Sequence, residues 1–513
     1  MTAETPRVDD AHLRRDENGR LTPEPPAGDF RDSPPFPVAA KRELANVQQR
    51  RNLHHATHTI RKKRANAVEE LPNWQQMRRA GGQLKNRVLR HLPHYLEQLE
   101  ESLTANGATV HWARDGEEAN RIVVDLVREA QAEEVVKVKS MLTQEIGTNE
   151  ALEQASIAAW ETDLAELIVQ LGHDRPSHIL VPAIHRNRSE VRDIFRKEMG
   201  QYGMAAPDDL DAQPPHLAAA ARAHLREKFL RSTVGISGGN FAIAETGQLV
   251  VVESEGNGRM CLTLPETLIS LVGIEKVIPR FEDLEVFMQL LPRSSTAERM
   301  NPYSSIWSGA APGDGPHNVH VVLVDNGRTQ VLEDPKGRDA LRCIRCSACL
   351  NVCPVYEQVG GHAYGGVYPG PIGAILNPQL RGLDSKVDRA LPFASSLCHA
   401  CSDVCPVEIP IADLLVHMRH KVVEAKREDG GVLPHAEPAI MKAGGWVMGD
   451  HRRLKAVQAG SKATGGVLGR VTDHFGPLPW PLSKWTNARD VPMPPGKTFR
   501  DWWDNEHEKK DES

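Results

Sequence analysis

Seven of the eight cysteines in this 513-residue chain fall into two short runs about fifty residues apart. The first run extends from Cys343 to Pro354 and has the spacing C-x2-C-x2-C-x3-C-P. In bacterial ferredoxins with this spacing, three cysteines surround one cubane iron–sulfur cluster, and the fourth, which precedes a proline, binds a second cluster. We therefore expect the chain to fold so that the two runs meet around a pair of clusters.

The second run extends from Cys398 to Pro406 and contains only three cysteines. If the last cysteine of each run crosses to the other cluster, the expected ligands of cluster 1 are Cys343, Cys346, Cys349 and Cys405, and those of cluster 2 are Cys353, Cys398 and Cys401. A fourth cysteine of the second run would stand at Ser395. Cluster 1 is thus expected to be 4Fe–4S. Cluster 2 is either 3Fe–4S, or 4Fe–4S completed by Ser395, His399, another side chain, water or a partner's ligand.

Disulfide bonds and zinc fit the cysteine spacing less well than iron–sulfur clusters do. Disulfide frameworks are typical of short secreted chains, which this sequence does not resemble. Zinc sites usually combine two separated C-x2-C or H-x3-H pairs, whereas the first run has three cysteines at successive steps of three residues. The remaining cysteine, Cys261, lies in an apolar stretch and is expected to be a packed thiol.

Length and composition indicate an ordinary globular protein of about two to four domains, with 40% apolar and 25% charged residues. The net charge of −6 gives no reason to expect a nucleic-acid partner. The sequence contains no run of about 18 apolar residues, so no transmembrane segment is predicted. Residues 1–32 lack the apolar core of a secretion signal. Reduced thiols then favour a cytoplasmic location.

Local composition divides the chain into five segments. Residues 1–37 are polar and proline-rich, which predicts a flexible arm, and residues 38–103 predict a helical lead-in. The basic residues of the lead-in are expected to form a solvated face or a docking face for an acidic partner. Residues 104–330 predict an α/β domain, residues 331–430 an iron–sulfur domain, and residues 431–513 a helical stretch with a Trp- and Pro-rich tail.

Strand-like and helix-like patterns alternate between residues 104 and 330, which predicts a largely parallel sheet. The predicted strands are residues 108–112, 135–138, 157–161, 178–181, 272–278 and 319–324, with a hairpin between 238 and 252. Ligands of parallel sheets gather at the carboxyl ends of the strands. Five candidate residues fall near those ends, although each is more often a packing or surface residue: Lys137, Lys139, Ser140, Pro182 and His185.

A glycine-rich loop at residues 253–259 combines carboxylates with an arginine. Its backbone N–H groups are able to bind a small polar or phosphorylated ligand, but a tight turn accounts for the glycines equally well. The loop is neither G-x-G-x-x-G nor a P-loop, so no nucleotide fingerprint is present. The sequence also identifies no base for a substrate, and the catalytic residues remain unassigned.

Several short motifs, in order along the chain, resemble the lactate utilisation protein B family, the iron–sulfur member of a three-protein L-lactate oxidation system. The resemblance implies a lactate-utilisation (LUD) domain up to about residue 330, similar in fold to the sugar-phosphate isomerase and CoA-transferase group. An α-helical ferredoxin-like module is implied beyond it, with a second run of only three thiolates. Besides the two cysteine runs, the motifs are Leu71–Trp74, Val110–Arg114, Lys139–Leu142, Glu161–Asp163, Pro182–His185, Ala244–Gly247 and Glu255–Arg259.

The resemblance implies an electron-transfer subunit of a multi-protein complex that oxidises L-lactate to pyruvate, so that lactate serves as a carbon and energy source. Its implied partners are the other subunits of that system and an electron acceptor of unknown identity. The chain is therefore expected to be a subunit of an oxidoreductase rather than a catalyst alone. Two alternatives stay open: electron transfer from another 2-hydroxy acid such as glycolate, and a cluster-based redox or metabolite sensor.

Overall fold

A computed structural model describes residues 33–311, 313, 315–428, 436–468, 474–475, 483, 491–494 and 497–511. The chain divides into two units, Met1–Ala425 and Lys426–Ser513. The first unit contains the two larger sheets and all eight cysteines. The predicted flexible arm lies outside the described residues up to position 32, and helix α1 (Phe36–Glu43) begins close to its predicted end.

Six parallel strands form the main sheet in the order β1-β10-β7-β4-β2-β3. Strands β4 and β7 are buried along their whole length, which agrees with their position inside a sheet that is covered on both faces. The prediction of a mostly parallel α/β sheet is confirmed. In chain order the strands are β1 (Thr109–Ala113), β2 (Glu134–Lys137), β3 (Ala158–Glu161), β4 (Val234–Gly238), β7 (Thr267–Gly273) and β10 (Asn318–Val324).

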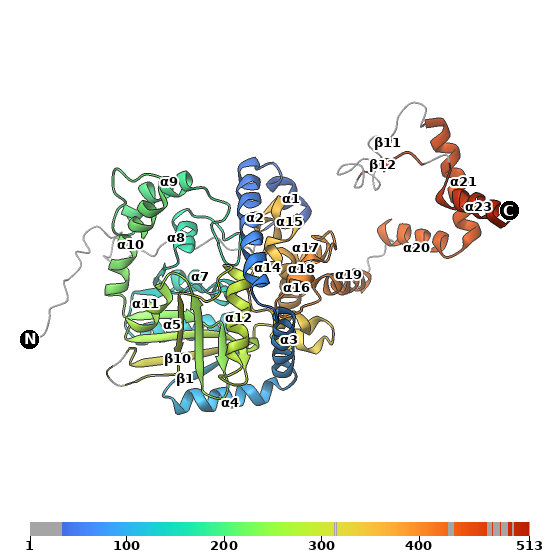
Figure 1. Cartoon of the computed structure of the whole chain (residues 1–513). Coiled ribbons are helices and arrows are strands. Elements are labelled where there is room, and N and C mark those ends of the chain that lie inside the picture. The colour runs from blue at the N-terminus through green and yellow to red at the C-terminus, as the bar shows by residue number, and fades with distance from the viewer. Residues whose placement is uncertain are drawn as a thin grey trace, which may run out of the picture. The chain divides into compact units, whose positions relative to one another are not determined.

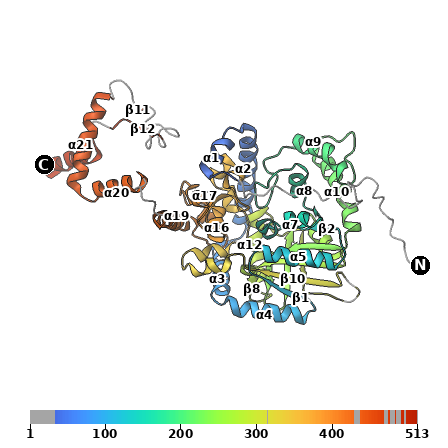
Figure 2. The same ribbon diagram turned by 180° about the vertical axis from the view of Figure 1, so that it is seen from behind.

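Helices and a second sheet cover the two faces of the main sheet. Helices α5 (Gly116–Glu129), α6 (Met141–Ile146) and α7 (Thr148–Gln154) pack on one face, and Figure 2 shows α5 and α7 in front of the strands. The other face packs against α4 (Leu92–Ala105) and a four-stranded sheet, β8-β5-β6-β9. Around the β2–β3 edge lie α8 (Leu164–Leu171), α9 (Arg188–Glu198), α10 (Pro214–Arg231) and α11 (Asn257–Thr263).

The predicted hairpin is formed by the antiparallel strands β5 (Phe241–Ile243) and β6 (Gln248–Glu253). The prediction of one strand over residues 272–278 is wrong. Strand β7 ends at Gly273, a 3-10 turn η3 (Ile274–Lys276) follows, and β8 (Val277–Ile278) joins the four-stranded sheet together with β9 (Tyr303–Trp307). The apolar run continues because both strands are buried, but the chain changes sheets between them.

The predicted strand at residues 178–181 is also wrong, because these residues form a loop. His178 Nδ1 accepts hydrogen bonds from the backbone N–H groups of Leu180 and Val181, at 3.1 and 3.0 Å. Its Nε2–H therefore donates to Asn351 Oδ1, 3.2 Å away. A buried side chain thus takes the backbone donors that a sheet would have used, and Pro182 follows directly.

The iron–sulfur region is helical, which confirms the predicted ferredoxin-like module. Both cysteine runs lie between short helices, and the longer helix α19 packs its apolar residues beneath them. In chain order its elements are α13 (Arg328–Glu333), η4 (Gly337–Arg342), α14 (Ala348–Asn351), α15 (Pro354–Val359), η5 (His362–Tyr364), α16 (Gly370–Arg381), α17 (Lys386–Ala390), η6 (Leu391–Phe393), α18 (Ala400–Val404) and α19 (Ile411–Glu428).

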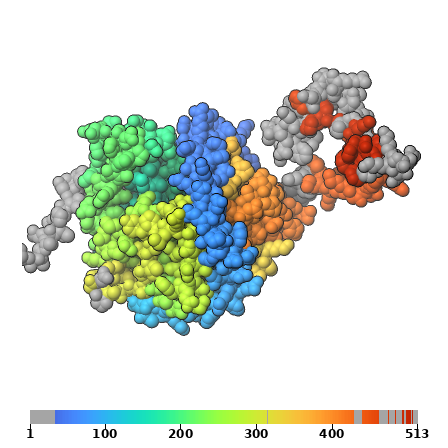
Figure 3. All heavy atoms as spheres, in the orientation of Figure 1, coloured from blue at the N-terminus to red at the C-terminus, as the bar shows by residue number. Residues whose placement is uncertain are grey.

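The N-terminal helices α2 (Val47–Glu69) and α3 (Trp74–Arg90) lie against this module, and Figures 1 and 3 show them, in blue, between the α/β domain and the orange helices. Several of their basic side chains contact the module. Arg61 pairs with Glu357 at 2.7 Å, and Arg64 donates to the Val404 carbonyl at 2.8 Å. These two arginines are engaged inside the chain, whereas Arg51, Lys62 and Lys63 are exposed, as expected for the predicted solvated or docking face.

The second unit contains α20 (Ala436–Met448), α21 (His451–Leu468), a short antiparallel pair β11 (His474–Phe475) and β12 (Val491–Pro492), and α23 (Phe499–Asp511). In α23 the rings of Phe499, Trp502 and Trp503 pack against one another in tilted and edge-on pairs. Of the tryptophans that the sequence singled out in the tail, Trp480 and Trp485 lie outside the described residues. Among the described residues, no helix is both long and apolar enough to span a bilayer.

Candidate functional site

The first cysteine group brings together Cys343, Cys346, Cys349 and Cys405. The first three lie between η4 and the end of α14, and Cys405 directly follows α18. All four line one small cavity, and its other walls are mainly apolar: Ile179, Ile344, Ile372, Val407, Ile409 and Ile411. Residues from both runs thus share one cavity, as the crossed pattern requires.

The second cysteine group consists of Cys353, Cys398 and Cys401. Cys353 is the N-cap of α15, Cys398 lies two residues before α18, and Cys401 is inside that helix. In addition to burial, Cys398 raises the pKa of Cys353, and both thiols raise the pKa of Cys401, so the three thiols lie close together. Cys398 is exposed, whereas the other two are buried, so this group reaches the protein surface. Cys349 is also a neighbour of Cys401, which makes the two groups adjacent.

The two cysteine loops have the same backbone conformation around Cys346 and Cys398, the residues at the second ligand position of each pattern. In the first loop the flanking residues Arg345 and Ser347 both have φ of +60°. In the second loop Leu397 and His399 have φ of +55° and +67°. A non-glycine residue in this left-handed region is uncommon, so two such pairs at matching positions indicate one shared loop conformation.

The match extends to the first position of each loop. The backbone N–H of Arg345 donates to Cys343 Sγ at 3.4 Å. In the second loop the N–H of Leu397 donates to Ser395 Oγ at 3.1 Å. Ser395 therefore presents its hydroxyl oxygen where the first loop presents a thiol.

The electrostatics of the thiols fit a cationic centre. Burial, together with the neighbouring Cys405 and Cys343, raises the pKa of Cys346 to about 12. Burial, Cys353 and Cys398 likewise raise the pKa of Cys401 to about 12. Thiolates crowded in this way are stable only when a metal centre neutralises them. Soft all-sulfur ligand sets of this kind are typical of iron–sulfur clusters and of zinc.

Backbone amides also point at the sulfurs. Besides Arg345, Tyr356 donates its N–H to Cys353 Sγ at 3.5 Å, and Ile409 donates to Cys405 Sγ at 3.4 Å. Hydrogen bonds to the ligand sulfurs are one of the ways in which proteins set the potential of an iron–sulfur cluster. The residues present therefore fit a pair of clusters.

A second cavity, here called the polar pocket, lies beside the first cysteine group and has a volume of about 320 Å³. It opens at the carboxyl ends of β2, β4 and β7, where a parallel sheet usually binds its ligands. Its polar lining includes Lys139, Ser140, Asn240, Glu253, Glu255, Lys276, Asn301, Arg328 and Arg345. The sequence pointed to Lys139 and Ser140, but not to Lys276, Asn301 or Arg345.

A buried ion network forms the wall between the polar pocket and the first cysteine group. Arg328 donates through Nε to Glu275 at 2.6 Å, and its two terminal nitrogens reach the Glu145 carboxylate at 2.8 and 3.0 Å. Arg345, inside the first cysteine run, reaches the same Glu275 at 3.3 Å and stacks over the ring of Tyr368. The network therefore joins the α/β domain to the cysteine loop.

Two pocket side chains titrate near neutrality. Burial and the nearby guanidinium of Arg345 lower the pKa of Lys276 to about 8. Burial and the neighbouring carboxylate of Asp163 raise the pKa of Glu255 to about 7. Near neutral pH the glutamate thus carries less than a full negative charge.

In the glycine-rich loop at residues 253–259, the carboxylate of Glu253 occupies the backbone N–H groups that were candidates for binding an anion. Glu253 accepts hydrogen bonds from the backbone N–H groups of Gly256, Gly258 and Arg259, at 2.8–3.1 Å. These amides are therefore already paired and do not face a phosphate. The glycines serve a tight turn, with Gly256 in the left-handed region at φ +85°.

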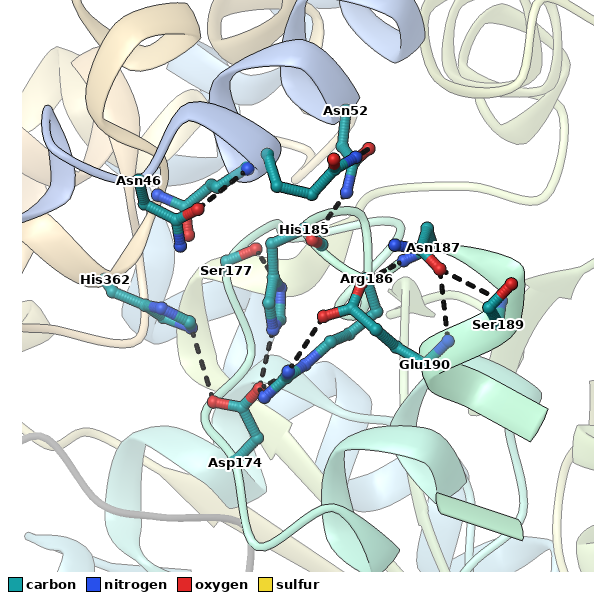
Figure 4. A network of polar contacts seen from close by, with 12 residues as sticks. Asn46, Asn52, Asp174, Ser177, His185, Arg186, Asn187, Ser189, Glu190 and His362 are labelled. Atoms are coloured by element: carbon teal, nitrogen blue, oxygen red, sulfur yellow. Dashed lines mark hydrogen bonds and ion pairs between the residues drawn. The ribbon is translucent and has the colours of Figure 1, made fainter. Parts of the chain in front are cut away.

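Three of the other candidate residues have structural roles. Lys137 is buried and pairs with Glu161 at 2.7 Å. His185 belongs to a separate polar network, shown in Figure 4, in which its Nε2 contacts Asp174 Oδ2 at 2.7 Å and its Nδ1 contacts Ser177 Oγ at 2.8 Å. Pro182 lies in the loop within this network, since its carbonyl accepts the Ser177 N–H.

The Asp174 network also has the donor types of a metal site, because Asp174, His185 and His362 each offer an atom within 4.8 Å of the others. Those atoms are already engaged, however. Arg186 and His185 share one carboxylate oxygen of Asp174, and His362 Nε2 contacts the Arg175 carbonyl at 2.7 Å. We interpret the network as a tie between the loop at residues 174–186 and η5. Burial raises the pKa of Asp174, but the hydrogen bond and charge of His185, the charge of His362 and the N–H of Arg175 together outweigh burial and hold it below its usual range.

Cys261 is fully buried among apolar side chains, as predicted for a packed thiol. Its nearest polar neighbour is Thr162, with Oγ1 3.5 Å from Sγ. Burial raises the pKa of this thiol to about 12. Cys261 packs in a different hydrophobic cluster from the two cysteine groups, so it is not a candidate ligand of either.

Comparison with known proteins agrees with the two-part architecture. Residues 96–324 match the family model described as "LUD domain", and residues 339–409 match the one described as "4Fe-4S dicluster domain". The fold and the cysteine groups thus define an α/β LUD domain joined to an iron–sulfur dicluster domain.

Relatives along almost the whole chain specify the family. A protein named lactate utilization protein B from Bacillus licheniformis is 41% identical over 91% of this chain and 96% of its own length. The proteins of the same name from Oceanobacillus iheyensis and Bacillus subtilis are 42% and 40% identical, over 90% and 91% of this chain and 94% and 95% of theirs. The chain belongs to the lactate utilization protein B family.

Proposed function

We propose that this chain is the iron–sulfur electron-transfer subunit of a multi-protein system that oxidises L-lactate to pyruvate. The observation that carries the proposal is the pair of adjacent cysteine groups in a chain whose relatives are named for lactate utilisation. Oxidation of lactate to pyruvate releases two electrons and two protons. An iron–sulfur cluster normally passes one electron at a time, so two adjacent clusters divide the pair into single transfers.

The positions of the thiols support an order for this transfer. The first cysteine group is enclosed and borders the polar pocket, whereas the second reaches the surface at Cys398. Electrons are therefore expected to enter near the first group and to leave through the second toward an acceptor. The sensor alternative is weakened, because two basic residues of the lead-in, Arg61 and Arg64, contact the module, although Arg51, Lys62 and Lys63 remain exposed.

Anaerobically purified chain, with its iron and acid-labile sulfide counted, provides the test of this function. We expect lactate-dependent dye reduction only when the chain is combined with the other proteins of the system. Glycolate and other 2-hydroxy acids in the same assay test the choice of substrate. The proposal is wrong if the complete, cluster-loaded set leaves the dye oxidised with L-lactate.

For cluster 2 we propose that Ser395 supplies the fourth ligand through its hydroxyl oxygen. The support is the shared loop conformation, in which Ser395 Oγ accepts the N–H of Leu397 as Cys343 Sγ accepts that of Arg345. His399, the other nearby candidate, corresponds to Ser347 of the first loop, which is not a ligand position of the pattern. The second cluster would then be 4Fe–4S with one oxygen ligand.

We expect Ser395→Ala to lose one iron of about eight per chain and to show the EPR signal of an oxidised three-iron cluster. Ser395→Cys should keep all four irons, because it completes the second cysteine run. Ser396→Ala is the matched control, since its side chain is exposed and adjacent. A Ser395→Ala protein with the iron count and EPR spectrum of the wild type would exclude Ser395 as a ligand.

A further inference from the structure

The polar pocket is a binding site that the cysteine groups do not account for, and we propose that it binds a small organic anion of the 2-hydroxy or 2-oxo carboxylic acid class. The pocket is at the lower end of the size range of ligand sites, which is about 300–1,000 Å³. It thus has room for a three-carbon acid with accompanying water. The choice of this acid class rests on the function proposed above, whereas the anion site itself does not.

Lys276 is the expected anchor for the carboxylate. It lies on turn η3, where the chain passes from one sheet to the other, and its side chain is half-buried in the pocket wall. Within the described part of the chain, its ammonium makes no hydrogen bond and has no carboxylate oxygen within 4.0 Å. Lys276 thus has no direct ion pair, and its charge acts on Glu275 only at longer range, so an anion bound in the pocket would give the ammonium a direct partner.

The acidic side chains of the pocket do not compete for Lys276, because they are engaged elsewhere. Asp163 accepts the N–H groups of Ala165 and Glu166, and Glu253 caps its own loop as described above. Glu255 accepts the N–H of Leu164 at 3.1 Å. Glu275 is held by Arg328 and Arg345. None of these four carboxylates forms a direct ion pair with Lys276, so its ammonium is available to a ligand in the pocket.

An unpaired acceptor faces the same space. Asn301 lines the pocket with 9% of its surface exposed, and its Oδ1 has no hydrogen-bond partner among the described residues. Buried polar atoms are nearly always paired, so an unpaired one in a cavity wall indicates a ligand or water that completes it. A hydroxyl group on the ligand would donate to this oxygen, whereas Lys276 binds the carboxylate.

The polar pocket also lies close enough to the first cysteine group for the charges of the two sites to influence each other. Ile179 and Arg345 line both the polar pocket and the cavity of that group. Although burial lowers the pKa of Lys276, the charge of Cys343 is among those that raise it. An anion placed on Lys276 will therefore alter the electrostatic field at a cluster held by Cys343, and this effect gives a readout that is independent of catalysis.

The test uses the full, anaerobically purified, cluster-loaded chain. Isothermal titration calorimetry is carried out with L-lactate, pyruvate, propionate and inorganic phosphate, on the wild type and on the variants Lys276→Gln, Asn301→Asp and Lys197→Gln. Lys197 is the matched control, because it is exposed on α9 and does not line the pocket. EPR spectra of the reduced chain are recorded with and without pyruvate. Iron counts confirm that each variant retains its clusters.

We expect L-lactate and pyruvate to bind the wild type and the Lys197→Gln variant alike, and propionate to bind more weakly because it lacks the oxygen substituent. Lys276→Gln should weaken binding about tenfold or more, and Asn301→Asp should weaken it through like-charge repulsion. Pyruvate should change the EPR spectrum of the wild type but not that of Lys276→Gln.

Three results would overturn the proposal: no binding of any probe, binding unaffected by Lys276→Gln, or binding of phosphate alone. Binding of lactate that requires Lys276, in a system that nevertheless fails to oxidise lactate, supports the pocket and contradicts the proposed function. Oxidation of lactate by the full system, with no binding to this chain, supports the function and contradicts the pocket.

Discussion

The Cys353→Ala variant is expected to lose the cluster associated with Cys398 and Cys401 while keeping the one associated with Cys343. Iron per chain should fall from about eight, or about seven if cluster 2 has three irons, to about four. The physical reason is that Cys353 belongs to the first run in sequence but neighbours Cys398 and Cys401 in space. Iron and sulfide counting with EPR of the reduced protein measures the result.

The Cys349→Ala variant tests the other cluster, because Cys349 lines the cavity of the first cysteine group. It should remove the other cluster and leave the signal that Cys353→Ala eliminates. Cys261→Ala serves as the control and should keep both clusters, since this thiol is buried away from both groups. Loss of the Cys343-associated cluster alone in Cys353→Ala would show that the ligands do not cross.

The Arg328→Met variant is expected to lower the free energy of unfolding by about 3–5 kcal/mol. Arg328 is 1% exposed, and its removal leaves the carboxylates of Glu275 and Glu145 without their principal counter-ion. Methionine fills much of the space, so the loss reports mainly the unpaired buried charges rather than a cavity. Urea unfolding of the anaerobic protein, followed by circular dichroism, measures the change.

Arg299→Met is the matched control, because Arg299 also pairs with a glutamate, Glu70, but on the surface. Solvent screens such pairs, and no measurable change in the unfolding midpoint is expected. Because the Arg328 network also holds Arg345 inside the first cysteine run, Arg328→Met should in addition make the first cluster more labile. Equal stability of the Arg328→Met and wild-type proteins would mean that the network contributes nothing net to folding.

Short-range patterns were enough to predict most of the strands and the helical module. Where prediction failed, tertiary structure decided the local conformation. Residues 178–181 have the apolar composition of a strand, but the side chain of His178 takes their backbone donors and is itself held by Asn351. Residues 272–278 form one apolar run, yet the chain changes sheets at η3 within it. Neither event leaves a periodic signal in the sequence.

The candidate site divides in the same way. Thiol spacing predicted the ligands within each run, because residues a few positions apart are close in any fold, and the ferredoxin pattern predicted which cysteine of each run crosses to the other group. The same spacing placed Ser395 at the missing cysteine position, and the matched loop conformation around Cys346 and Cys398, seen only in the folded chain, favours it over His399. Lys276 and Asn301 carry no motif: Lys276 lies on η3 directly after β7, Asn301 lies in the loop before β9, and only the folded chain brings both to the polar pocket.

The primary structure thus defined a chain built to bind two clusters, since a metal-binding run is a local property that survives without knowledge of the fold. The folded structure alone decided which side chains stand next to the first cysteine group. Arg345, Glu275 and Arg328 are brought together from three segments, and burial makes their charges strong enough to matter. Burial and long-range proximity arise from packing, so residue spacing does not encode them directly.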